Sequence, residues 1–263
     1  LRSLAEDFER KEPRVALPRP AGRLTAEGVS FRMPGTETQV LSGIRFAVAA
    51  GEALAIVGPS AAGKSTLARL LTGVWAPTAG RVRLDGADLA DWPREHLGPY
   101  IGYVPQDVEL FDGTVAENIA RLDQVDSEAV VAAAMRANAH EMILALPRGY
   151  DTPVGEHGVR LSPGQRQRVA FARAVYGNPQ LVVLDEPNSN LDGAGEMALA
   201  QAMGALREAG VTTVVVTHRP SLMAHVDKIM VVGAGRIQQF GPAGEVMKEM
   251  QRQNLAIVER KAA

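Results

Sequence analysis

The segment Gly58–Thr66 has the residue types and spacing of a phosphate-binding loop. It reads GPSAAGKST, which satisfies the pattern G-x-x-x-x-G-K-[ST], and it follows the apolar run EALAIV and precedes the helical run TLARLLTGV. Glycines let such a loop turn its backbone N–H groups toward phosphate oxygens, while the lysine adds positive charge and the serine offers a hydroxyl to Mg²⁺. The alternative, an ordinary glycine turn, is disfavoured by the flanking strand and helix. We expect the whole loop to bind phosphate: Gly58, Pro59, Ser60, Ala61, Ala62, Gly63, Lys64, Ser65 and Thr66.

A pair of carboxylates follows the apolar run in LVVLDE. Because the carboxyl ends of parallel strands form the ligand crevice of an α/β sheet, both acids would lie near the phosphate loop. We expect Asp185 to hold Mg²⁺ through water and Glu186 to act as the general base that takes a proton from an attacking water. Two strand-end acids facing solvent are the alternative, and the neighbouring GPSAAGKST motif disfavours it.

Two further polar residues end predicted strands. Gln106 follows Ile101–Val104 and Pro105, and its uncharged amide could complete a Mg²⁺ or water shell. Taken alone, a loop glutamine is the simpler interpretation. His218 follows Val211–Val216, where it could sense a γ-phosphate by hydrogen bonding, and it is the only histidine for which we predict a function.

A second anion-binding feature is the segment LSPGQ, at residues 161–165, directly before the helical run RQRVAFARAVY. Ser162 as N-cap, Pro163 at the first helical position and Gln165 at the third form a capping-box pattern. The Ser162 hydroxyl, the Gly164 N–H and the positive helix end are then available to an anion. A capped helix without a ligand explains the same pattern, and the residues alone leave both interpretations open.

Buried strands must position these side chains. Five short apolar runs, each ending in a polar or glycine-rich loop, are typical of a mostly parallel sheet. They are Ala53–Val57, Ile101–Val104, Leu181–Leu184, Val211–Val216 and Lys228–Val232. Before them, LTAEGVSFRM and VLSGIRFAVAAGE alternate apolar and polar residues and predict antiparallel strands. Between the second and third runs, about residues 109–178 are rich in helix formers, which predicts an inserted helical lobe.

Composition fits one large or two-lobed globular unit. The 263 residues are 46% hydrophobic and 22% charged, which argues against disorder. The 28 basic against 30 acidic residues give no global attraction to nucleic acid. Cysteine is absent, so disulfides and thiolate sites are excluded. No apolar run is long enough to span a bilayer, and the charged start LRSLAEDFERKEP is unlike a signal peptide.

Six motifs occur in a fixed order: GPSAAGKST, Gln106, LSPGQ, LVVLDE, SNLD (Ser189–Asp192) and His218. In this order they resemble the nucleotide-binding domain of ATP-binding cassette transporters, over about residues 23–250. The resemblance implies an α/β P-loop NTPase cassette that binds ATP and Mg²⁺ and hydrolyses ATP. It also implies a head-to-tail dimer of two copies, in which Ser162, Gly164 and Gln165 contact the partner's ATP and Asp192 lies near the dimer seam.

Other segments indicate a subtype. TPVGEHG (Thr152–Gly158) and FDGTVAENI (Phe111–Ile119) resemble exporters, and LSPGQRQR, DEPNSNLD and GRIQQFGP resemble type I secretion ATPases that export proteases and other hydrolases. The resemblance then implies that residues 1–22 are a helix end and linker from a preceding transmembrane domain, and that residues 251–263 are a C-terminal tail. It implies as partners the transmembrane domain and possible periplasmic adaptor and outer-membrane channel proteins, no nucleic acid, and a location at the cytoplasmic face of the inner membrane.

The sequence departs from the family at two positions. Pro163 stands where the family usually has glycine, which removes one backbone donor at the helix start. Met33 stands where an aromatic residue commonly stacks on adenine, and methionine can still pack its thioether on a ring. The rival interpretations are an importer cassette, a soluble cassette ATPase of DNA repair or translation and, less well supported, a phosphate-transferring kinase.

Overall fold

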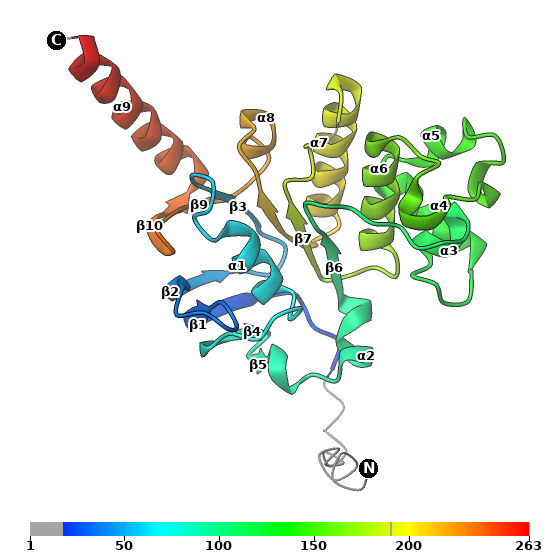
Figure 1. Cartoon of the computed structure of the whole chain (residues 1–263), viewed down its shortest axis with the longest axis horizontal. Coiled ribbons are helices and arrows are strands. Elements are labelled where there is room, and N and C mark those ends of the chain that lie inside the picture. The colour runs from blue at the N-terminus through cyan, green and yellow to red at the C-terminus, as the bar shows by residue number, and fades with distance from the viewer. Residues whose placement is uncertain (1–17, 190, 263) are drawn as a thin grey trace, which may run out of the picture.

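The computed structural model describes residues 18–189 and 191–262, so residues 1–17 of the expected helix end and linker lie outside the described residues. Residues 18–23 form a connector without helix or strand that leads into β1 (Figure 1). The carboxylate of Asp85 holds this connector, because it accepts hydrogen bonds from the backbone N–H groups of Ala21, Gly22 and Arg23 at 2.7, 3.0 and 3.0 Å.

The described strands form two sheets. The four-stranded sheet has the order β2-β1-β4-β5, and the six-stranded sheet has the order β10-β9-β3-β8-β7-β6. The strands are β1 (Leu24–Arg32), β2 (Gln39–Val48), β3 (Ala53–Val57), β4 (Ala79–Leu84), β5 (Ala87–Asp88), β6 (Ile101–Val104), β7 (Leu181–Asp185), β8 (Thr212–Val216), β9 (Lys228–Gly233) and β10 (Arg236–Pro242).

The larger sheet confirms the prediction of a mostly parallel core. β9, β3, β8, β7 and β6 pair in parallel, and only β10 pairs antiparallel with β9. Successive residues of the central strands enter opposite cores, as the period of a strand requires. In β3, Ala53, Ala55 and Val57 face one hydrophobic core, whereas Leu54 and Ile56 face the other. Both faces are therefore covered, which explains the continuous apolar runs.

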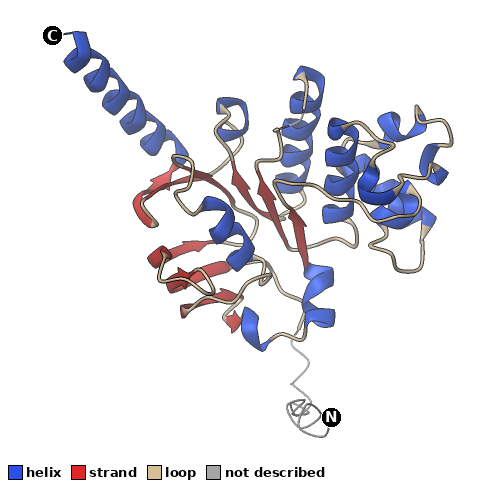
Figure 2. Ribbon diagram, in the orientation of Figure 1, coloured by secondary structure: helices blue, strands red, loops and turns tan. Residues whose placement is uncertain are grey.

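The smaller sheet confirms the predicted antiparallel pair and adds strands that the sequence did not indicate. β1 and β2 pair antiparallel, with Phe31 opposite Leu41, and β4 pairs with the other edge of β1. Helix α1 (Lys64–Leu71) packs its apolar side chains into the core that β1, β2 and β4 share with one face of the larger sheet. The helix that follows the phosphate loop thus joins the two sheets (Figure 2).

The remaining helices are α2 (Arg94–Leu97), α3 (Val115–Ile119), α4 (Ser127–Arg136), α5 (His140–Leu144), α6 (Pro163–Val175), α7 (Gly193–Glu208), α8 (Pro220–Met223) and α9 (Ala243–Ala262), the last of which continues through the expected start of the tail at residue 251. Helices α3 to α8 pack on the other face of the larger sheet and include the predicted lobe, α2 packs on the same core as α1, and α9 projects away from the sheets (Figure 1). Asn138, with a φ of 51°, separates two helices in a stretch of continuous helical pattern. No helix in the described ranges is long and apolar enough to cross a membrane.

Helix α6 is fixed to the sheet along β6 and at its C-terminal end. The guanidinium of Arg121 donates to the carbonyl oxygens of Arg173, Ala174 and Tyr176 at 3.2 Å each and to that of Gly98 at 2.6 Å. These bonds satisfy carbonyls that a helix end leaves without partners, and they place positive charge at the negative end of the helix dipole. The lobe, helix α6 and the residues before β6 are thereby joined by one side chain.

Gly102 permits the close approach of β6 to α6. A Cβ atom at Gly102 would lie 2.1 Å from the carbonyl oxygen of Ala174. This oxygen belongs to the backbone, so it cannot rotate away as the end of a flexible side chain can. Gly102→Ala should therefore destabilise the chain by about 1–3 kcal/mol, as overpacking of a core does. Gly98→Ala is the matched control, because nothing lies within 4 Å of that Cβ. Urea unfolding measures both, and equal midpoints would contradict the prediction.

Candidate functional site

The predicted chemical residues follow four neighbouring strands of the larger sheet. The order β3-β8-β7-β6 places the phosphate loop after β3, His218 after β8, Asp185 and Glu186 at the end of β7 and Gln106 after β6. Because these strands are parallel, their carboxyl ends lie at one edge of the sheet. Phosphate-loop residues, Gln106 and Glu186 line one pocket at this edge, which is made by Val40, Ser60, Ala61, Gly63, Lys64, Ser65, Thr66, Gln106 and Glu186.

The phosphate loop is held in a backbone conformation that requires its glycines. Gly58 has a φ of 151°, and a Cβ there would lie 2.0 Å from the carbonyl oxygen of Val232. Gly63 has a φ of 95°, and its Cβ would meet Leu41 at 2.7 Å. Lys64 is buried, and its ammonium donates to the carbonyl oxygens of Gly58 and Pro59 at 2.8 Å. The loop thus holds a positive charge at the centre of its own turn.

Asp185 is a fully buried carboxylate, and only one of its two oxygens is hydrogen-bonded by a described residue. Its Oδ1 accepts from the Ser65 hydroxyl at 3.1 Å, whereas Oδ2 is buried and receives no hydrogen bond from any described residue. Burial raises the pKa of Asp185 above its usual value and the nearby Glu186 carboxylate adds to this, while the bond from Ser65 opposes it. A buried, underused carboxylate beside a serine hydroxyl fits a magnesium site, because Mg²⁺ prefers oxygen ligands and keeps several of its waters.

Glu186 lies between Gln106 and His218. One carboxylate oxygen accepts from the Gln106 amide at 3.3 Å, and the other lies 3.6 Å from Nε2 of His218. The backbone of Glu186 has a φ of 49°, a left-handed conformation that is strained for a non-glycine residue. The structure therefore brings together three residues that the sequence placed on separate strands, around one carboxylate that opens into the phosphate-loop pocket.

The segment LSPGQ begins helix α6 with the predicted capping box. The Ser162 hydroxyl accepts from the Gln165 N–H at 3.2 Å, and the Gln165 side chain accepts from the Ser162 N–H at 2.8 Å. This helix start opens on a second pocket, lined by Met142, Ser162, Pro163, Gly164, Gln165, Arg168, Leu191 and Asp192. The two pockets share no lining residue, so the two predicted anion-binding segments of this chain lie at separate pockets.

The apolar residues in and next to the hairpin of β1 and β2 occupy different environments. Phe31 is buried and stacks on Trp75 with ring centroids 5.1 Å apart, so its ring is part of the core. Met33, just after β1, is 37% exposed. Val40, on the paired strand, lines the phosphate-loop pocket. Of these three residues, Val40 lines the phosphate-loop pocket, and Met33 is not among the residues that line it.

Two contacts of helix α6 were missed by sequence reasoning. The Gln167 amide donates to the backbone carbonyl of Glu186 at 3.4 Å, and the Arg168 guanidinium lies 3.8 Å from the Asp192 carboxylate. The repeated Gln-Arg pairs after LSPGQ were the only available signal, and they fitted an exposed helix face equally well. Gln167 is in fact 2% exposed.

Comparison with known proteins assigns the family. The sequence profile described as "ABC transporter" matches residues 41–189, more than half of the chain. The chain belongs to the ABC transporter family. The family is one of ATP-hydrolysing domains, which confirms the sequence-based expectation of an ATP-binding ATPase.

Individual relatives are ABC exporters and secretion ATPases. The chain is 49% identical to the type I secretion system ATP-binding protein PrsD of Rhizobium meliloti, over 96% of this chain and 44% of that protein. It is 45% identical to an ATP-dependent lipid A-core flippase of Chromobacterium violaceum, over 86% and 39%. The structure of a bacterial Atm1-family ABC exporter with ATP bound matches with a TM-score of 0.82 and 38% identity, over 97% and 44%. The chain thus spans less than half of the length of these ABC transporters.

The buried Asp185 carboxylate predicts a stability effect in this ABC transporter domain. A raised pKa in the folded state means that ionised Asp185 destabilises the fold at pH values above the unfolded pKa, and that this cost disappears as acid protonates the group. Asp185→Asn should therefore raise the melting temperature of the nucleotide-free chain at pH 7, and the gain should vanish near pH 3. The exposed Asp151→Asn is the matched control. A lower melting temperature for Asp185→Asn at pH 7, measured by calorimetry, would contradict the assignment.

Proposed function

We propose that the chain is the ATPase cassette of an ABC exporter and that it drives type I protein secretion. The observation that carries the proposal is the pocket in which Lys64, Ser65, Gln106 and Glu186 meet, beside the buried carboxylate of Asp185. The 49% identity to a type I secretion ATP-binding protein favours secretion over the lipid export of the flippase relatives. An importer cassette and a soluble repair or translation ATPase are less well supported, because neither occurs among these relatives.

In the proposed mechanism the loop binds the phosphates and Glu186 activates water. Phosphate oxygens would take the place of the two carbonyls at the Lys64 ammonium, with further donors from the backbone of Gly58–Thr66. Ser65, Gln106 and Asp185, the last through water, would hold Mg²⁺, which neutralises phosphate charge when bound. Glu186 would accept a proton from the attacking water. His218, 3.6 Å from that carboxylate, would hydrogen-bond the γ-phosphate.

Completion of the site would require a second copy of the chain. The LSPGQ pocket lies apart from the phosphate-loop pocket, so its donors would serve a nucleotide held by another chain. In a head-to-tail dimer, Ser162, Gly164 and Gln165 of one copy would face the phosphate loop of the other, with Asp192 near the seam. Pro163 has no N–H to contribute, but the capping box keeps the helix start and its dipole intact.

The resemblance to a type I secretion ATP-binding protein supports the remaining proposed partners. ATP hydrolysis would drive conformational change in a transmembrane domain of the same transporter. Periplasmic adaptor and outer-membrane channel proteins would be further partners, and nucleic acid would not be one. The cassette would then lie at the cytoplasmic face of the inner membrane. Phe111, 57% exposed in the FDGTVAENI segment, is one apolar group through which the cassette could contact that domain.

Glu186→Gln tests the proposed general base. The variant should bind MgATP as tightly as the original chain but lose at least about 100-fold in steady-state hydrolysis, because an amide cannot take a proton from water. Static light scattering should show dimers of this variant with MgATP and monomers without it. Glu208→Gln, an exposed change at the end of α7, is the matched control. Undiminished hydrolysis in Glu186→Gln would disprove the general-base role.

Met33→Tyr tests whether Met33 supports the adenine ring. A tyrosine at this position should stack on the base and tighten ATP binding by about 0.5–1.5 kcal/mol, roughly 2- to 12-fold in Kd. Met197→Tyr is the matched control, because Met197 is exposed on α7, away from the phosphate-loop pocket. The affinities are measured with a fluorescent ATP analogue in competition with ATP. Equal Kd values for both variants and the original chain would remove Met33 from the site.

A further inference from the structure

Gln167 is a buried polar residue that the proposed mechanism does not use. It lies in helix α6, five residues after the N-cap Ser162, and is 2% exposed. Its Nε2 donates to the carbonyl oxygen of Glu186 at 3.4 Å, and its Oε1 is buried without a hydrogen bond from the described residues. A buried amide that is only half satisfied costs stability, so its presence needs a reason other than packing.

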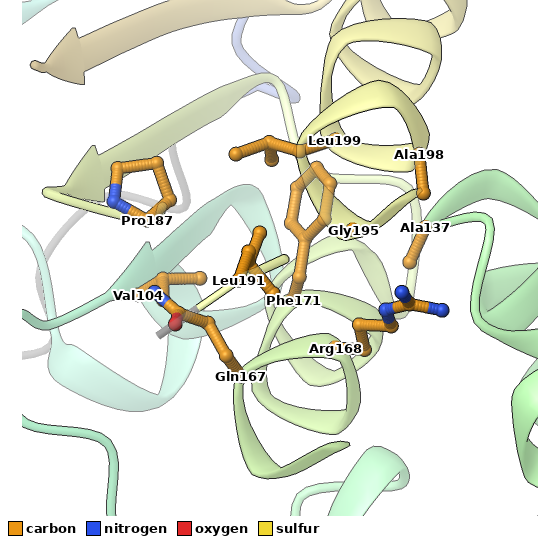
Figure 3. Close-up of a pocket in the computed structure, with 10 residues that line it drawn as sticks. All are labelled: Val104, Ala137, Gln167, Arg168, Phe171, Pro187, Leu191, Gly195, Ala198 and Leu199. Atoms are coloured by element: carbon orange, nitrogen blue, oxygen red, sulfur yellow. The ribbon is translucent and has the colours of Figure 1, made fainter. Parts of the chain in front are cut away.

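The surroundings of Gln167 are otherwise apolar. Figure 3 shows its side chain at a small cavity that separates α6 from α7 and from the chain after β7. Apart from Gln167 and Arg168, the lining residues offer no polar side chain: they are Val104, Ala137, Phe171, Pro187, Leu191, Gly195, Ala198 and Leu199. The amide therefore has one polar contact among the described residues, and that contact is the backbone of the candidate general base.

The backbone of Glu186 depends on a few hydrogen bonds for its position. Its φ of 49° is strained, so the conformation persists only where neighbouring groups hold it. Its N–H donates to the carbonyl of Val216 at 3.0 Å, and its carbonyl accepts from the Ser189 N–H at 3.2 Å and from Gln167. The next residue of α6, Arg168, lies 3.8 Å from Asp192, so two consecutive residues of the helix contact both ends of the segment 186–192.

Helix α6 is suited to carry displacement from one end to this contact. It has 13 residues, its start bears LSPGQ, and its last carbonyls are held by Arg121. A displacement of the helix start would move Gln167, which lies less than two turns away and donates to the Glu186 carbonyl. We propose that Gln167 is a positioning residue that couples the LSPGQ segment to the backbone of Glu186 in the same chain. Engagement of LSPGQ by the partner's nucleotide then sets the general base of the chain's own ATP site.

This inference rests on the proposed function as a dimeric ATPase. Mixed dimers show whether Gln167 acts on the ATP site of its own chain or on that of its partner. A limiting amount of an active chain is mixed with a large excess of Glu186→Gln chain, so that nearly every active chain faces an inactive partner. The rate of the first turnover then reports the one intact Glu186. Gln167→Met is introduced either into the limiting chain or into the excess chain.

The expected result is a loss only when the substitution is in the limiting chain. There, the first-turnover rate should fall by about 10-fold or more, because small displacements of a catalytic group have large effects, while the ATP concentration that gives half-maximal rate stays unchanged. In the excess chain, Gln167→Met should leave the rate unaltered. Gln180→Met, the same change at a side chain that hydrogen-bonds the nearby carbonyl of Asn178 and does not line the cavity beside Gln167, is the control in both arms.

Stability provides the second measurement. Methionine is close to glutamine in shape, the cavity is apolar, and the Glu186 carbonyl keeps its bond from Ser189, so Gln167→Met should not lower the melting temperature. If Gln167→Met does not fold, Gln167→Leu is used in the same mixtures. No loss in the limiting chain, or an equal or larger loss in the excess chain, would overturn the inference. Absence of MgATP hydrolysis by the original chain would instead refute the proposed function.

Discussion

The burial of the Asp185 carboxylate is the constraint around which the site is built. The apolar strand β7 brings this group to the end of a sheet covered on both faces, where Ser65 satisfies one oxygen and no described residue satisfies the other. Such a charge is costly in a low-dielectric environment. The compensation lies nearby, because the phosphate loop holds Lys64 at its centre and starts helix α1 beside the carboxylate. A site that is unsatisfied without ligand and adjacent to fixed positive charge is well prepared for a cation bound together with phosphate.

The parallel order of the central strands brings the candidate site residues together. β3, β8, β7 and β6 each end at the same edge, so the loop, His218, Glu186 and Gln106 meet without any one of them leaving its own strand end. Helix α6 then packs closely on β6, where Gly102 allows contact with the backbone at Ala174. LSPGQ, which starts this helix, is thereby held at a fixed position relative to the sheet edge at which the carboxylates lie.

Much of this arrangement could be predicted from the sequence, because the informative patterns are local. Continuous apolar runs indicated β3, β6, β7, β8 and β9, and the capping box indicated the start of α6. β4 and β10 were missed because the first half of β4 and the whole of β10 lack fully buried residues, so few apolar positions mark them in the sequence. The contact from Gln167 to Glu186 spans 19 residues, and the clamp of Asp85 on Gly22 spans 63. Such pairings depend on how elements pack, which periodicity and motif spacing do not encode.

The Gln167 contact matters because the two proposed anion-binding segments, LSPGQ and the phosphate loop, lie apart within one chain. If LSPGQ and the phosphate loop bound the same nucleotide, a link between α6 and Glu186 would only stabilise a single site. Because their pockets share no residue, the proposed dimer assigns them to different nucleotides. The same helix that would contact one ATP at its start then contacts, within two turns, the backbone of the residue that would hydrolyse the other. An amide is suited to this link, because it can hydrogen-bond the carbonyl of the strained Glu186 backbone without placing another charge beside Asp185 and Glu186.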